Sequence, residues 1–123
     1  MKVRDYKELK VWQRSFELTK EIYLITKRFP EDEKYGLTSQ IRRAAVSVPS
    51  NIAEGANRGS TKEFIRFLYI AIGSSAELES QLLLVEELGF LNKSICESKE
   101  KLQEVIKMLH GLIRSLKRVE GQE

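Results

Sequence analysis

The sequence has one cysteine, Cys96, one histidine, His110, and no glycine-rich phosphate loop among its 123 residues. A lone cysteine excludes an intrachain disulfide framework and any multi-cysteine zinc or iron–sulfur site, and it favours a reducing, intracellular setting. Neither residue has a second histidine, a cysteine or an acidic cluster at ligand spacing, so neither forms a metal site or an activated nucleophile. We therefore expect no enzyme activity, no metal and no cofactor.

Long apolar runs are also missing. No stretch approaches the length of a membrane span, and the charged first ten residues do not resemble a signal peptide. These features predict a cytoplasmic protein with no membrane partner. The net charge is only +3, because 21 lysines and arginines stand against 18 aspartates and glutamates. The net charge therefore does not indicate nucleic-acid binding, and such a function has to be argued from where the lysines and arginines lie.

Only two prolines and seven glycines interrupt a chain rich in good helix formers, which favours an all-α fold. Apolar periodicity and capping signals predict four helices, over 7–29, 37–56, 61–88 and from 94 to about 118. Short connections between helices of this length predict an antiparallel up-down-up-down four-helix bundle. We expect the bundle to cover 1–119 and the tail at 120–123 to be frayed.

Local signals set the expected helix ends. The first helix should end at Phe29 because Pro30 follows it, and Asp32 and Thr38 compete as the N-cap of the second. Two capping boxes open the later helices, Ser60 with Glu63 and Ser94 with Glu97. Gly89 is expected to end the third helix.

Pro49 lies inside the second predicted helix. It has no backbone N–H to donate to the carbonyl of Ala45, so we expect a kink or an interruption there. Asn51 and Glu54 follow in an otherwise nearly apolar helix. Their side chains either satisfy the freed backbone groups or hydrogen-bond a neighbouring chain, and the sequence leaves both interpretations open.

The first predicted helix has two apolar stripes where a monomeric bundle needs one. One stripe contains Leu9, Trp12, Phe16 and Tyr23, and the other contains Val11, Leu18, Ile22, Ile25 and Phe29. A second stripe needs a second partner, because soluble monomers rarely expose a contiguous apolar patch. We therefore expect a homo-oligomer whose interface includes Val11, Leu18 and Ile22, with Asn51 and Glu54 as further candidates.

Basic residues gather between positions 42 and 66, where only Glu54 and Glu63 oppose them. They are Arg42, Arg43, Arg58, Lys62 and Arg66. Bases near the start of the third helix and glutamates toward its end both oppose the helix dipole. Such placements mark partner-facing sites or charge pairs between neighbouring helices. The five bases are our candidate phosphate-binding residues.

The run LTSQIRRAAVSVPSNIAEG at 37–55 resembles the signature of the bacterial four-helix-bundle family of 23S rRNA intervening-sequence proteins. The resemblance extends to LKVW at 9–12, to FP at 29–30 with YGL at 35–37, and to AIGS at 71–74. It covers the first three predicted helices, whereas the fourth fits by apolar pattern alone.

This resemblance implies a small antiparallel bundle that assembles as a ring-like homopentamer without enzymatic activity. Relatives include the accessory variability determinant of diversity-generating retroelements, which binds nucleic acid and a reverse transcriptase through a basic surface. By this analogy, we expect the five bases to bind RNA or DNA. The alternative function is a protein-interaction scaffold for a polymerase, such as a reverse transcriptase, or for a ribosome-associated partner.

Overall fold

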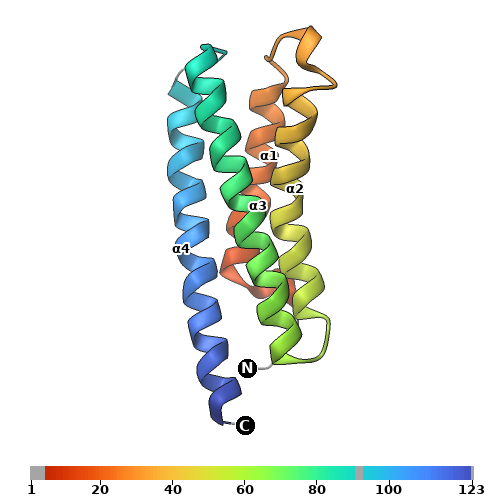
Figure 1. Ribbon diagram of the computed structural model, residues 1–123, viewed down its shortest axis with the longest axis vertical. Helices are drawn as coiled ribbons and strands as arrows, with labels where there is room; N and C mark the ends of the chain where they lie inside the picture. The colour runs from red at the N-terminus through yellow and green to blue at the C-terminus, as the bar shows by residue number, and fades with distance from the viewer. Residues whose placement is uncertain (1–4, 91–92, 123) are drawn as a thin grey trace.

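The computed structural model describes residues 5–90 and 93–122, without the side chains of residues 93, 94 and 122. Four long helices run alternately up and down side by side (Figure 1). They are α1 (Lys10–Thr26), α2 (Leu37–Ala56), α3 (Thr61–Leu88) and α4 (Lys93–Gln122), and two short 3₁₀ helices, η1 (Tyr6–Glu8) and η2 (Glu31–Glu33), precede α1 and α2. The described residues contain no strand, so the all-α class and the four-helix bundle are confirmed.

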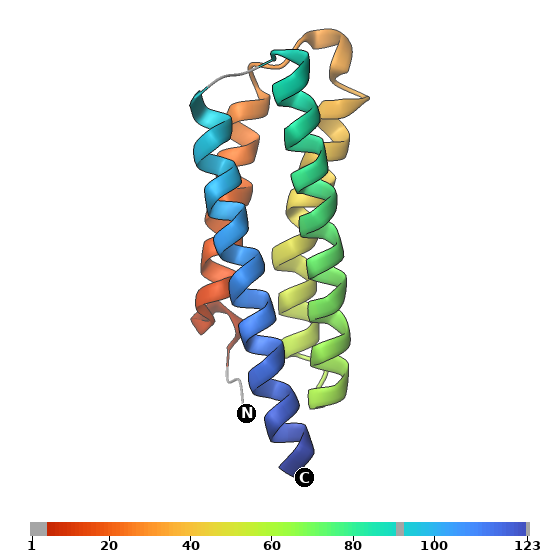
Figure 2. The same ribbon diagram turned by 60° about the vertical axis from the view of Figure 1, so that its left-hand side comes forward.

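Each long helix packs against two neighbours. Helix α1 contacts α2 and α4, and α3 contacts the same two helices. Among the described residues no Cα atom of α1 lies within 8 Å of one in α3, and the same holds for α2 and α4, so these two pairs of helices lie diagonally across the bundle. The C-terminal end of α4 extends past the other helices (Figure 2).

The core lies between the four helices and is formed by aliphatic side chains from all of them. The largest of those with less than 2 % exposure are Ile22, Ile41, Ile52, Leu68, Leu78, Leu82, Val85, Ile95, Leu102, Val105, Leu109 and Leu116. In α3 one stripe at helical spacing is buried; it comprises Phe64, Phe67, Leu68, Ala71, Ser75, Leu78, Leu82 and Val85. In α4 the isoleucine, leucine and valine side chains from Ile95 to Leu116 are buried except those of Ile106 and Leu112, which are half-buried.

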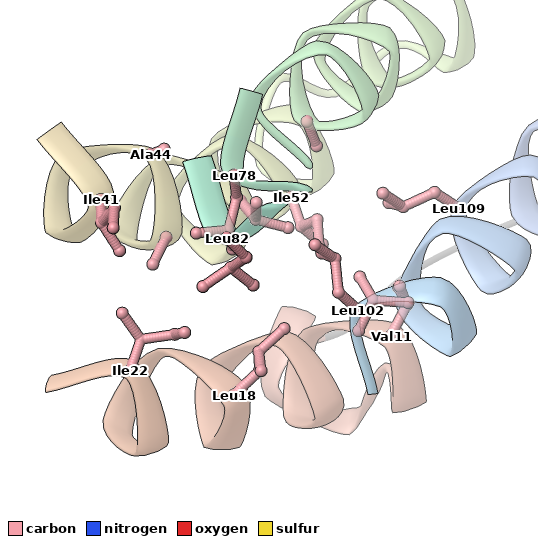
Figure 3. Close-up of a cluster of buried hydrophobic side chains, with 14 of the residues drawn as sticks. Val11, Leu18, Ile22, Ile41, Ala44, Ile52, Leu78, Leu82, Leu102 and Leu109 are labelled. Carbon is pink, nitrogen blue, oxygen red and sulfur yellow. The ribbon is translucent and has the colours of Figure 1, made fainter. Parts of the chain in front are cut away.

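The interface prediction for Val11, Leu18 and Ile22 is wrong. These side chains are 4 %, 3 % and 0 % exposed and point into the core of their own chain (Figure 3). Of the other stripe, Phe16 and Tyr23 are 42 % and 39 % exposed, whereas Leu9 and Trp12 are half-buried against the core. Helix α1 does have a second apolar face, but periodicity alone could not say which stripe the core would take.

Two of the predicted helices have the expected bounds, 37–56 and 61–88. The hydroxyl of Ser60 accepts a hydrogen bond from the backbone N–H of Glu63 at 3.0 Å, and Gly89 has φ 72°, so both predicted ends of α3 form. The return half of the capping box does not, because the Glu63 carboxylate accepts from Arg66 instead. The pairing of Ser94 with Glu97 lies outside the described residues.

The N-cap of α2 is neither of the two predicted residues. Gly36 occupies that position, and the carboxylate of Glu33 accepts a hydrogen bond from the N–H of Leu37 at 3.2 Å. Glu33 therefore caps the first turn of α2 in place of Asp32 or Thr38. Capping preference alone favours Asp32 and Thr38, and it does not include a side chain that reaches back from outside the helix.

The outer two helices differ from prediction at their ends. Extended backbone at Leu9 separates η1 from α1, which then ends at Thr26. Helix α4 continues to Gln122, so the segment expected to fray is helical as far as the structure describes it.

Pro49 does not interrupt α2, which is continuous through it. The carbonyl of Ala45, which loses its usual donor, lies 3.0 Å from the hydroxyl of Thr19 in α1, whose single proton it shares with the carbonyl of Ser15 at 2.8 Å. The amide of Asn51 donates elsewhere, to the carbonyl and hydroxyl of Ser47. The neighbouring helix therefore supplies the missing donor, and the proline ties α2 to α1.

Helices α2 and α3 approach closely at Gly55. A Cβ atom at this position would lie 2.6 Å from the Cβ of Phe67 and 3.1 Å from the ring of Phe64. Real Cβ atoms do not come this close to other atoms, so only glycine fits without a shift of α3. The contact fixes the geometry of the turn that follows it.

Gly55→Ala is therefore expected to lower the free energy of unfolding by about 2 kcal/mol, in the range typical of overpacking. Gly73→Ala in the middle of α3 is the matched control, because its new Cβ meets nothing within 4 Å. The control should gain about 0.5–1 kcal/mol from helix propensity. Urea denaturation measures both, and equal effects would contradict the close packing at Gly55.

The hydrogen bond from Thr19 to Ala45 predicts an energetic coupling with Pro49. Thr19→Val should lower the free energy of unfolding by about 1–3 kcal/mol, because it leaves a carbonyl without a donor. In a Pro49→Ala background the restored backbone N–H can donate to that carbonyl, so Thr19→Val should cost about 1 kcal/mol less. Denaturation of the four proteins measures the coupling, and strictly additive effects would disprove it.

Candidate functional site

The five predicted bases do not form one patch. Arg42 and Arg43 lie near the start of α2, whereas Arg58, Lys62 and Arg66 surround the turn between α2 and α3. The part of α2 between the two groups spans about 21 Å, at about 1.5 Å per residue. The two groups are therefore separate surfaces.

Arg42 has a structural role. Its Nε donates to the hydroxyl of Thr26 at 2.8 Å, and Nη2 donates to the carbonyl of Tyr23 at 3.3 Å. Its guanidinium carbon lies 4.7 Å from the centre of the Tyr23 ring. These contacts hold the start of α2 against the end of α1. Arg43, the next residue, is exposed, as a rotation of about 100° per residue requires.

Arg58 and Arg66 share one aromatic ring. Their guanidinium carbons lie 4.8 Å and 4.5 Å from the centre of the buried Phe67 ring. Each also donates to a glutamate at 2.9 Å, Arg58 to Glu54 and Arg66 to Glu63. Aromatic and carboxylate contacts together orient both planar groups at the protein surface.

The ion pairs leave both arginines charged and accessible. The hydrogen bond from Arg66 is the main cause that lowers the pKa of the Glu63 carboxyl, and the same bond raises the pKa of Arg66. The side chains of Arg58 and Arg66 remain 45 % and 55 % exposed. A guanidinium has five N–H donors, and these pairs use one or two of them, so donors remain for a second anion.

The fold brings further bases to this place that sequence reasoning missed. The ammonium group of Lys117 in α4 donates to the hydroxyl of Tyr69 in α3 at 2.9 Å. This contact places the C-terminal turns of α4 beside the first turns of α3, as the antiparallel ribbons show (Figure 2). We call the resulting surface the basic end; it comprises Arg58, Lys62, Arg66, Arg114, Lys117 and Arg118.

The opposite end of α3 is acidic. Residues 77–88 contain four glutamates and no base. Two of these glutamates contact α4, where Glu86 pairs with Lys99 at 3.1 Å and Glu79 accepts from Gln103. For these two glutamates, the interpretation as charge pairs between neighbouring helices therefore holds. Charge along α3 runs from basic at its start to acidic at its end.

A second surface, on α1, is apolar. We call it the aromatic face; it comprises Trp12, Phe16, Tyr23 and Leu24. The rings of Trp12 and Phe16 stack with centres 4.7 Å apart, and a shallow groove lies between Phe16, Tyr23 and Leu24. Leu24 is 63 % exposed.

Helix α3 exposes a third surface of aliphatic side chains, the leucine face. It comprises Leu83, Leu84 and Leu88, which are 46 %, 48 % and 51 % exposed. Exposed apolar side chains on two helices that lie diagonally across the bundle give it two distinct apolar surfaces.

The remaining interface candidates have partners within the chain. The side chain of Asn51 bonds Ser47, whose hydroxyl lies 2.7 Å from the hydroxyl of Ser74 in α3. Glu54 pairs with Arg58. A role for Asn51 or Glu54 between copies stays a prediction.

Metal and membrane features are absent from the residues that the structure describes. No three acidic, histidine or cysteine side chains in 5–90 and 93–122 are grouped to hold a metal ion. Over the same ranges, no helix combines the length and apolar character needed to span a bilayer.

These observations define a small helical-bundle protein with a basic end and two exposed apolar faces. The model of the 23S rRNA-intervening sequence protein family matches residues 7–111, and the chain belongs to that family. The match extends well into α4, beyond the motifs that carried the resemblance.

One solved structure supports the same assignment. It is the crystal structure of a protein with unknown function from the S23 ribosomal protein family from Bacteroides thetaiotaomicron. That protein is 25 % identical in sequence, and the alignment covers 85 % of this chain and 95 % of that chain with a TM-score of 0.78. No curated protein matches this chain by sequence.

Proposed function

We propose that this protein is a non-catalytic, homo-oligomeric bundle that binds the phosphates of RNA or DNA through its basic end. The observation that carries the proposal is the pair of arginines, Arg58 and Arg66, held on the ring of Phe67. A planar guanidinium presents parallel donors that match phosphate, and holding it in place reduces the entropy lost on binding. Phosphate contacts of this kind carry little sequence specificity.

The proposed assembly uses the aromatic face. A ring requires a heterologous interface, in which one face of each copy contacts a different face of the next. The aromatic face on α1 and the leucine face on α3 are two such surfaces. Five copies, the number that the family resemblance implies, would carry a formal +15 at +3 each, so weak phosphate contacts would add by avidity.

The second candidate function is a protein-interaction scaffold. The aromatic face favours it, because aromatic side chains are enriched at the centres of protein interfaces. In that case the face would hold a partner such as a polymerase or a ribosome-associated protein, and nucleic acid would not bind at low salt.

Replacement of Arg58, Lys62 and Arg66 by glutamine should weaken nucleic-acid binding at least tenfold. It should also reduce the dependence of the binding constant on salt concentration, because up to three phosphate contacts are lost. Helicity and oligomer size should stay unchanged. Mobility-shift titrations at several salt concentrations measure both effects.

The matched control replaces Lys27, Arg28 and Lys34 by glutamine. These exposed bases lie at the opposite end of the bundle, and their replacement changes the net charge by the same amount. An equal loss of binding in the control would show that only total charge matters. That result would remove the basic end as the site.

Light scattering should report a homo-oligomer for the unmodified protein, because a monomer would leave the aromatic face in water. Phe16→Glu combined with Leu24→Glu should reduce the particle to the 14.2 kDa monomer with its helicity intact. Tyr35→Glu is the control, since Tyr35 is 90 % exposed and lies on neither face. A monodisperse monomer of the unmodified protein at micromolar concentration would contradict the proposed assembly.

A further inference from the structure

Among the described residues of the basic end, Tyr69 is an exposed aromatic side chain that lies beside basic residues. It is 47 % exposed, and its hydroxyl already has a donor in Lys117. The same ammonium nitrogen lies 5.3 Å from the ring centre but 2.9 Å from the hydroxyl oxygen, so it sits toward the hydroxyl edge. Part of the ring surface therefore remains open to a ligand.

The neighbouring ring at this end has a different role. Phe67 is only 6 % exposed, and two guanidinium groups lie against it. It can position arginines but has no free surface on which a nucleobase could stack. Tyr69 has the opposite properties, since among the described residues no arginine lies against its ring and the side chain is exposed.

Two rows of side chains meet at Tyr69. On α3 the row is Lys62, Arg66 and Tyr69, and on α4 it is His110, Arg114 and Lys117. Both follow the i, i+4, i+7 spacing that places residues on one face of a helix, and all six residues are exposed. The bond between Tyr69 and Lys117 joins the rows into one strip. Among the described side chains, Glu63 is the only acidic one paired with a member of the strip.

Neither proposed contact surface between copies explains this tyrosine. Helix α1, which carries the aromatic face, lies diagonally across the bundle from α3. The leucine face begins at Leu83, fourteen residues further along α3, about 21 Å away at about 1.5 Å per residue. Tyr69 is thus an exposed aromatic ring that contacts Lys117 and lies in line with the basic residues of both rows.

We propose that the basic end takes single-stranded nucleic acid, with a base stacked on Tyr69 and the adjoining phosphates bound by Lys117, Arg66 and Arg114. This rests on the proposed function and narrows its substrate class. An exposed aromatic side chain within a basic strip is the usual device for binding single strands, whose bases offer open faces. In a duplex the base faces are covered by their neighbours, so Tyr69 would add nothing to duplex binding.

The test compares a short fluorescein-labelled oligothymidylate with a blunt duplex of equal length, measured by fluorescence anisotropy. Tyr69→Leu should weaken binding of the oligothymidylate roughly tenfold, the typical effect of losing one stacked base, and leave duplex binding unchanged. Tyr69→Phe keeps the ring and should retain most of the affinity. Tyr35→Leu is the control for an exposed tyrosine outside the strip.

Salt dependence separates stacking from charge. Tyr69→Leu should leave the salt slope unchanged, because no phosphate contact is lost. Lys117→Gln should lower the slope by about 0.7, the contribution of one phosphate on a single strand. Thermal unfolding of each variant establishes that it is folded before its binding is compared.

The outcomes distinguish this inference from the proposed function. If the unmodified protein binds both probes and Tyr69→Leu leaves oligothymidylate binding intact, the stacking role is overturned while phosphate binding stands. If Tyr69→Leu weakens both probes equally, or Tyr69→Phe loses as much as Tyr69→Leu, the inference also fails. If the unmodified protein binds neither probe at low salt, the proposed function itself is wrong.

Discussion

The close approach of α2 and α3 at Gly55 is the constraint on which the candidate site depends. Because no side chain fits there, the backbone of α2 lies against Phe67, whose Cβ would be 2.6 Å from a Cβ on Gly55. The ring of Phe67 then serves as the surface on which Arg58 and Arg66 rest. One aromatic side chain therefore closes the helix crossing and sets the positions of two cations. Phe67 therefore contributes both to the packing of α2 against α3 and to the proposed recognition of phosphate.

Much of the fold follows from local sequence patterns. The bounds of α2 and α3 rest on Gly89, Ser60 and apolar periodicity, which act within a few residues, and these predictions are confirmed. The predictions that failed depend on contacts between distant segments. The stripe of α1 that enters the core is chosen by the helices around it, and the donor that replaces the N–H of Pro49 comes from Thr19, thirty residues earlier. No rule of local propensity contains that information.

The candidate site was predictable only in part, for the same reason. Arg58, Lys62 and Arg66 are close in sequence, so their common location could be expected. Arg42 belongs to the same basic run, but its contacts with Thr26 and Tyr23 give it a structural role. Tyr69 and the bases of α4 were missed, because only antiparallel packing brings residue 117 beside residue 69. A search for bases facing each other across predicted antiparallel helices would have found them.

The most direct test of the account is the footprint of a bound oligothymidylate, measured by hydrogen–deuterium exchange. We predict slower amide exchange at 57–69 and 110–121 on binding, and no change in α1 or at 79–88. The basic end lies in 57–69 and 110–121, the aromatic face in α1 and the leucine face in 79–88. One experiment therefore measures exchange at all three surfaces. Protection confined to α1 or to 79–88, with none at the basic end, would contradict the central claim.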